Sequence, residues 1–121
     1  MKFDTQGLSP AEEQEINRLL TFSHNDPPEL EDIWKIMDRV WDELECDNSH
    51  PNSEKIAQYY QHPVWILNGI FIENHELSLQ HREAIASWVI KMNFNKILDF
   101  GGGIGILDSI IAEKNSQIII D

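Results

Sequence analysis

Four of the chain's six glycines stand within five residues, between two apolar segments near the end of the 121-residue chain. They are Gly101, Gly102, Gly103 and Gly105. Such a density of glycine predicts a tight loop that some other group approaches closely. The apolar run Ile97–Phe100 before it predicts a short buried parallel strand. Ile106–Ile111 has helical spacing, and Ile118–Ile120 predicts a second strand that stops at Asp121.

The spacing of the glycines excludes two common phosphate-binding motifs. A dinucleotide fingerprint needs a third glycine, and the two frames of this loop place Ile106 or Asp108 there. A P-loop needs a Gly-Lys-Ser/Thr ending, and the loop contains no lysine. What the sequence does contain is an acid two residues before the glycines, in DFGGGIG (residues 99–105).

This segment resembles the first motif of the class I S-adenosylmethionine-dependent methyltransferases, which reads acid-x-Gly-x-Gly-x-Gly. The cofactor carries a sulfonium and an ammonium but no phosphate, so a carboxylate beside the loop attracts it. Its methionine carboxylate can accept from backbone N–H groups near the helix start. The match is specific over 99–105 and supportive over Lys96–Asp121.

The resemblance implies the roles of six residues. Asp121 would hold the ribose hydroxyls, since an acid at the end of the second strand does so in this family; alternatively it is an ordinary strand residue, with the ribose acid beyond it. The residues implied to line the methionine half of the cofactor are Asp99, Gly101, Gly102, Gly103 and Gly105.

The fold expected on this basis is α/β. A helical N-terminal region (residues 1–92, with a polar linker at 45–53) would precede the start of a cofactor-binding domain (93–121). That second part would be the first strand–loop–helix–strand unit of a Rossmann-like methyltransferase fold. Because this fold has about seven strands, we expect the chain to be a truncated, helix-rich N-terminal portion, inactive alone.

Helix start signals divide the first ninety residues. Ser9 followed by proline and Glu12 predicts a capping box and a helix to about Phe22. Apolar residues at steps of three and four predict the strongest helix over Leu30–Leu44. A short helix is expected from Ser53 to Tyr60, and another begins with Ser78 as its cap and ends near Asn93.

Val64–Ile72 is ambiguous, because it is almost entirely apolar. Its composition allows a buried strand or hairpin. The family resemblance favours helical or irregular structure instead.

The charge balance restricts the partners. Residues 1–54 hold 14 acidic and 4 basic side chains (−10), and residues 55–121 hold 7 and 5 (−2), which together give the net charge of −12. This balance disfavours binding to a nucleic-acid backbone or to an anionic membrane. The unpaired edges of the predicted strands favour a homo-oligomer.

Neither cysteine nor histidine indicates a metal site. Cys46 is the single cysteine, and the five histidines lack metal-ligand spacing. The N-terminus is polar and resembles no signal peptide, so we expect a cytoplasmic protein.

The function we expect is that of an S-adenosylmethionine-dependent methyltransferase acting on an unknown acceptor, with a small molecule favoured. Its catalytic residues are not identifiable from the sequence. Two alternatives stay open. One is a dinucleotide-binding oxidoreductase, and the other is a non-catalytic acidic interaction module that uses Leu30–Leu44 as its contact face.

Overall fold

The computed structural model describes residues 3–121, and more than half of them are helical. They form two compact units, residues 3–71 and residues 72–121, which are described separately below. The division falls inside a helix, 21 residues before the expected domain boundary after residue 92. That boundary concerns a larger cofactor-binding domain and stays a prediction.

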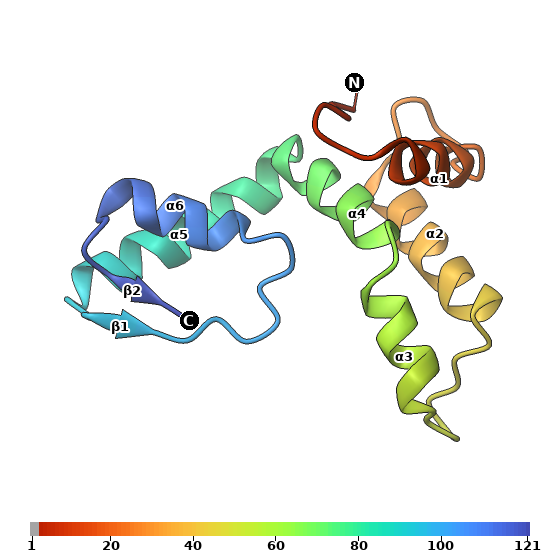
Figure 1. Ribbon diagram of the computed structural model, residues 1–121. Coiled ribbons are helices and arrows are strands. Elements are labelled where there is room, and N and C mark those ends of the chain that lie inside the picture. The colour runs from red at the N-terminus through yellow and green to blue at the C-terminus, as the bar shows by residue number, and fades with distance from the viewer. Residues whose placement is uncertain (1–2) are drawn as a thin grey trace. The chain divides into compact units, whose positions relative to one another are not determined.

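The first unit is built from helices (Figure 1). Its elements are α1 (Pro10–Leu20), α2 (Leu30–Glu43), α3 (Ser53–Tyr60) and most of α4 (Val64–Glu73). Its fully buried side chains come from α1, α2 and α4, and they include Ile16, Ile33 and Leu67. Trp41 on α2 meets Tyr59 on α3 edge-to-face, with ring centroids 5.0 Å apart. The apolar stripe of α2 therefore packs inside the unit.

The helix starts of this unit follow from local chemistry. The predicted capping box is confirmed at α1, where Ser9 Oγ accepts from the Glu12 N–H and Glu12 accepts from the Ser9 N–H. At α2 a reciprocal arrangement joins Glu29 and Asp32. Asp32 is buried, and it also accepts hydrogen bonds from the Asn25 side chain and the His24 N–H. Together these donors lower the pKa of Asp32 to about 2, and the backbone N–H of Glu29 has the largest effect. Each cap supplies acceptors that the first helical turn lacks.

The ambiguous segment is helical. Val64–Glu73 forms α4 and buries Leu67, Ile70 and Phe71, so the strand or hairpin that its composition allowed is not formed. Pro63 precedes this helix. The backbone N–H of its first residue, Val64, has no partner within the helix and donates to His62 Nδ1 at 3.1 Å. A helix that is apolar on most sides suits burial rather than a solvated surface.

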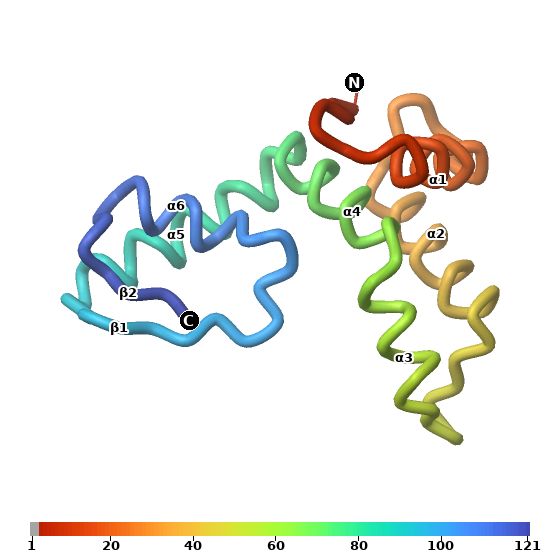
Figure 2. The backbone as a smooth tube through the Cα atoms, in the orientation of Figure 1, coloured from red at the N-terminus to blue at the C-terminus, as the bar shows by residue number. Residues whose placement is uncertain are grey.

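The second unit contains α5 (Glu76–Lys91), β1 (Lys96–Ile97), α6 (Ile106–Lys114) and β2 (Ile119–Ile120). Figure 2 follows the chain from β1 through a long loop to α6 and back to β2. The strands pair in parallel, Lys96 with Ile119 and Ile97 with Ile120. A small core of Ala86, Val89, Ile111 and Ile118 joins α5, α6 and the approach to β2.

The expected α/β fold class is wrong for the described chain. The one sheet among residues 3–121 has two strands of two residues each, far below the usual strand length of about five to six residues. The Rossmann-like strand–helix–strand unit expected over 93–121 is therefore not shown. Leu98 and Phe100, assigned from sequence to a buried strand, are 75% and 95% exposed. A buried parallel strand needs cover on both faces, and nothing in the described chain covers these side chains.

The cap of α5 also differs from the prediction. The helix begins at Glu76, and its cap is His75, whose Nδ1 accepts from the Ser78 N–H. Ser78, the predicted cap, lies in the first turn. Among the described residues, no helix is both long and apolar enough to cross a membrane.

Candidate functional site

The loop between β1 and α6 holds the glycines that the sequence singled out. Three of them have a positive backbone φ: Gly101 (78°), Gly103 (64°) and Gly105 (82°). Such angles cost about 1–2 kcal/mol for a residue with a side chain, which explains glycine at these three positions. Gly105 also precedes the first turn of α6, and its carbonyl accepts from the Ser109 N–H at 2.9 Å. The loop is thus wound tightly onto the start of the helix.

Gly102 needs a different explanation, because its φ is not positive. A Cβ added there would lie 2.5 Å from Asp99 Oδ2 and 2.8 Å from Asp99 Cγ. The Asp99 carboxylate therefore lies directly against the backbone of the loop, at a place where only glycine leaves room.

Asp108 brings a second carboxylate to the same place. It lies in the first turn of α6, and a Cβ on Gly105 would lie 4.0 Å from its Oδ2. Burial raises the pKa of Asp108 above its usual value, and the neighbouring Asp99 adds to this rise because the two carboxyls can share a proton but repel when both are ionised. From the sequence alone, Asp108 stands out only as a residue at a position where the dinucleotide fingerprint needs glycine. The sequence does contain a signal that could have identified Asp108. It lies in the first turn of the helix after the glycine loop, and the loop already contains an acidic residue, Asp99.

Both carboxylates contain an oxygen without a donor. Asp99 Oδ2 and Asp108 Oδ1 are buried, and nothing among the described residues donates a hydrogen bond to either when both groups are ionised. Buried acceptors are normally satisfied, and a charged one without a donor is costly. A cation or a strong donor placed between them would remove that cost.

Asp121 lies at the end of β2, beside the first residues of the loop. Its backbone N–H donates to the Ile97 carbonyl at 3.1 Å, and its own carbonyl accepts from the Asp99 N–H at 2.9 Å. The side chain is half exposed, and its Oδ2 pairs with Lys96 Nζ at 2.6 Å. The structure thus brings Asp121 to the base of the glycine loop by backbone pairing, with one carboxylate oxygen engaged by lysine.

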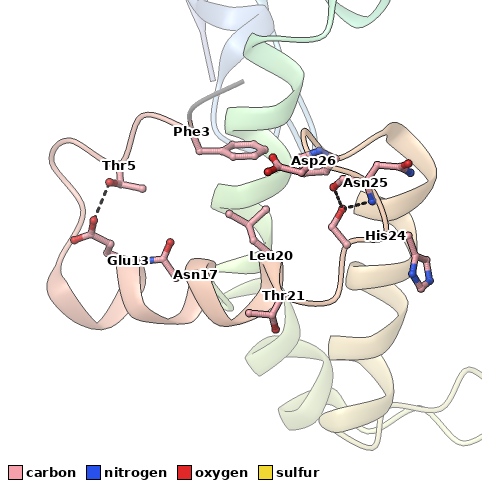
Figure 3. A pocket seen from close by; sticks show the side chains of 11 residues that line it. Phe3, Thr5, Glu13, Asn17, Leu20, Thr21, His24, Asn25 and Asp26 are labelled. Carbon is pink, nitrogen blue, oxygen red and sulfur yellow. Dashed lines mark hydrogen bonds between the residues drawn. The ribbon is translucent and has the colours of Figure 1, made fainter.

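A separate pocket lies in the first unit, between the N-terminal segment, α1 and the loop that follows α1 (Figure 3). Its volume is about 600 Å³. No sequence pattern indicates this pocket, since its lining comes from three segments that carry no shared motif.

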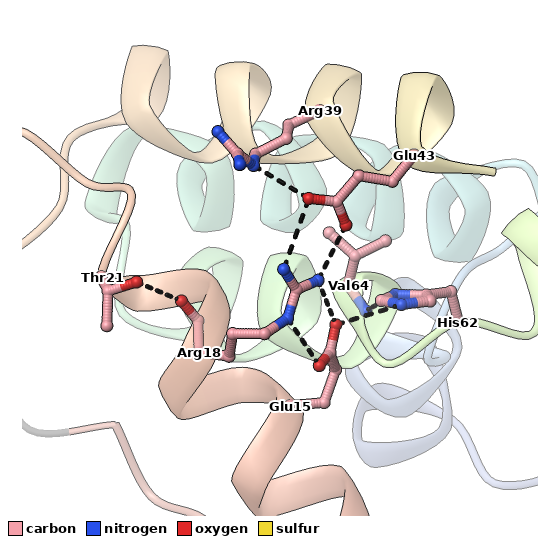
Figure 4. Close-up of polar contacts among 7 residues, drawn as sticks. All are labelled: Glu15, Arg18, Thr21, Arg39, Glu43, His62 and Val64. Atoms are coloured by element: carbon pink, nitrogen blue, oxygen red, sulfur yellow. Dashed lines mark hydrogen bonds and ion pairs between the residues drawn. The ribbon is translucent and has the colours of Figure 1, made fainter. Parts of the chain in front are cut away.

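A cluster of ion pairs also lies in the first unit (Figure 4). Arg18 Nη2 pairs with Glu15 at 2.7 Å and with Glu43 at 2.8 Å, and Arg39 pairs with Glu43 at 2.9 Å. His62 Nε2 lies 3.3 Å from Glu15. These contacts join α1, α2 and the turn between α3 and α4, so their role is structural.

The alternative contact face on α2 is largely internal. Ile33, Ile36 and Val40 are buried, and of the two tryptophans of α2 only Trp34 is exposed, at 56%. Among the described residues, no group of three or more histidine, cysteine or acidic side chains is placed to hold a metal ion.

Comparison with known proteins gives no match to a family model, to a curated protein or to a solved structure.

Proposed function

We propose that this chain is part of an S-adenosylmethionine-dependent methyltransferase and that the loop at residues 98–105 binds the cofactor. The observation that carries the proposal is the carboxylate pair at the loop. Asp99 and Asp108 each present a buried oxygen without a donor, against a backbone from which side chains are absent.

The chemistry of the pair suits this cofactor. S-adenosylmethionine presents an ammonium and a sulfonium, and both gain from ionised carboxylates close by. A pyrophosphate would be repelled by the same groups, which argues against a nicotinamide or flavin dinucleotide at this loop. The residues present therefore fit the cofactor better than they fit the dinucleotide alternative.

The glycines would let the ligand approach the backbone. No atom lies within 4 Å of a Cβ built on Gly101 or Gly103, so the space beside these two positions is open. At the start of α6 the first N–H groups lack partners within the helix, and they can bind the methionine carboxylate. Asp121 is proposed to accept from the ribose hydroxyls through the oxygen that Lys96 does not engage.

The cofactor supplies an activated methyl group, and the transfer is a displacement in which positioning accounts for much of the rate. The role proposed for this chain is to hold and orient the cofactor. The acceptor is proposed to be a small molecule bound by parts of the enzyme beyond the described loop, and the chain alone is proposed to be inactive.

Location and partners follow from composition. A net charge of −12 disfavours nucleic acid and anionic membranes as partners. A single cysteine suits a reducing compartment, and we propose the cytoplasm.

Calorimetry of the 121-residue chain with S-adenosylmethionine, S-adenosylhomocysteine and NAD tests the proposal. The first two ligands should bind, the first more tightly because only it carries the sulfonium charge, and NAD should not. Gly103→Val should abolish binding, since φ at this position is 64° and valine does not adopt it without strain. Binding of NAD, absence of binding by all three ligands, or unchanged affinity in the variant would overturn it.

A further inference from the structure

The pocket of the first unit has the size of a small-molecule site. Its volume of about 600 Å³ lies within the range of about 300–1,000 Å³ that is usual for such sites. Three segments form it: the N-terminal residues, the outer side of α1 and the loop from Thr21 to Pro28. The lining residues that matter below are Phe3, Glu13, Asn17, Leu20, Asn25 and Asp26.

The pocket contains two acidic side chains. Glu13 and Asp26 both line it, and no lysine or arginine is among the described residues that do so. Glu13 Oε1 accepts from Thr5 Oγ1 at 3.0 Å, which leaves Oε2 available. Within residues 3–121, no hydrogen bond or ion pair reaches the Asp26 carboxylate. The pocket thus offers two carboxylates that have no positive partner among residues 3–121.

The rest of the lining is suited to a ligand with an apolar body. Phe3 and Leu20 contribute an aromatic ring and an aliphatic side chain, and Figure 3 shows Phe3 beside Asp26 and Leu20 near Asn17. An aromatic face attracts an ammonium group by cation–π interaction. The amide oxygens of Asn17 and Asn25 can accept from ammonium protons.

The surroundings strengthen the preference for a cation. Residues 1–54 carry a net charge of −10, and a field of one sign around a concave site raises the local concentration of oppositely charged ligands. An anion, such as a phosphate or a carboxylate, would meet repulsion from both carboxylates, and no lysine or arginine among the described lining residues would offset it.

We infer that this pocket binds a small organic ammonium compound, with its alkyl chain against Phe3 and Leu20 and its ammonium groups on Glu13 and Asp26. The site lies within the first unit. The inference does not depend on the glycine loop or on methyl transfer.

The probe for the test is 1,4-diaminobutane, titrated into the full 121-residue chain at low ionic strength and followed by calorimetry. The uncharged control is 1,4-butanediol, which has the same carbon chain. We expect saturable binding of the diamine with one-to-one stoichiometry and no binding of the diol. Absence of diamine binding, or equal binding of both compounds, would overturn the inference.

Variants locate the binding. Glu13→Gln keeps an acceptor for Thr5 and Asp26→Asn keeps the side-chain shape, and each should weaken diamine binding at least tenfold. Phe3→Leu should weaken it less, because the apolar contact remains. The matched control is Glu54→Gln, which removes the same charge from an exposed position on α3. If Glu54→Gln weakens binding as much as Glu13→Gln does, the diamine responds to net charge alone and the proposed site is wrong.

Circular dichroism of each variant shows whether the helices are retained. If Asp26→Asn does not fold, Glu13→Gln and Phe3→Leu still test the inference, because they alter separate sides of the pocket. Full affinity in both of those folded variants would overturn it.

Discussion

Asp99 and Asp108 bring two carboxyl groups together beside the glycine loop. Burial and the neighbouring Asp99 raise the pKa of Asp108, and when both groups are ionised one oxygen of each is buried without a donor. Gly102 permits this arrangement, since a side chain there would collide with Asp99. An arrangement that costs stability without a ligand, and that a cation would relieve, is typical of a binding site.

Replacement of Gly102 by alanine tests the contact with Asp99. The backbone angle suits alanine, so the expected loss of stability, about 1–3 kcal/mol, comes from the collision with the carboxylate. In an Asp99→Ala background the same replacement should cost much less. Chemical denaturation of the four proteins gives this coupling, and equal costs in both backgrounds would show that the two residues do not meet.

Replacement of Asp108 by asparagine tests the raised pKa. A carboxyl whose pKa is raised by folding binds its proton more tightly in the folded state. Its contribution to the free energy of unfolding is therefore greatest at low pH and falls as pH rises through the folded pKa. Asp108→Asn should therefore melt at a higher temperature than the parent at pH 7, and the advantage should disappear near pH 3. The control is Glu113→Gln, on the exposed side of α6. A variant less stable than the parent at pH 7 would contradict the assigned repulsion.

At the scale of elements, the glycine loop depends on α6 for its position. Ile111 is 1% exposed and fixes α6 in the small core of the second unit. Ile111→Ala should lower the free energy of unfolding by about 2–5 kcal/mol, because it leaves a cavity where neighbours cannot collapse fully. Ile104→Ala, at a position that is 46% exposed, should change it by less than about 0.5 kcal/mol. Hydrogen exchange at the amides of α5 and α6 measures the loss of stability in each variant. Similar protection in the two variants would refute the packing of Ile111 in the core of the second unit.

The helices were predictable because their signals are local. Ser9 and Glu12 lie three residues apart and form their capping box without help from the rest of the chain. The strands were predictable only in part. β2 (Ile119–Ile120) lies within the predicted run, but of Ile97–Phe100 only Ile97 belongs to a strand, because burial of Leu98 or Phe100 depends on elements distant in sequence. The segment at 64–72 was ambiguous for the same reason, since an apolar run suits a buried helix and a buried strand alike. His75 was missed as a cap because histidine is not among the residues preferred there.

The candidate site was partly predictable. Its glycines lie within five consecutive residues and predicted a tight loop, and three of the four have a positive φ. Asp108 was missed because its meaning depends on the distance to Asp99 in space. The pocket around Phe3 and Asp26 was not predictable, since no local pattern joins the segments that line it.

On the scale of the whole molecule, several of the exposed apolar side chains of the second unit belong to the glycine loop and β2. Leu98, Phe100 and Ile104 all lie in the loop and are exposed, and Ile119 in β2 is 58% exposed. Exposed apolar groups beside a two-stranded sheet whose outer edges are unpaired among the described residues favour association.

We therefore expect self-association that rises with concentration, as measured by sedimentation velocity. Replacement of Leu98 and Phe100 together by serine should reduce it. Trp34→Ser, at an exposed site in the first unit, should leave it unchanged. A chain that is monomeric at all concentrations, or one that associates equally in all three forms, would contradict this prediction.

The measurement that tests the central claim most directly is a titration of the isotopically labelled chain with S-adenosylmethionine, followed by the amide resonances of each residue. The account predicts saturable shifts that begin at Asp99, extend through the glycines to Asp108, and are absent in Gly103→Val. A titration that leaves residues 98–108 unmoved, or that moves them equally in the valine variant, would contradict it.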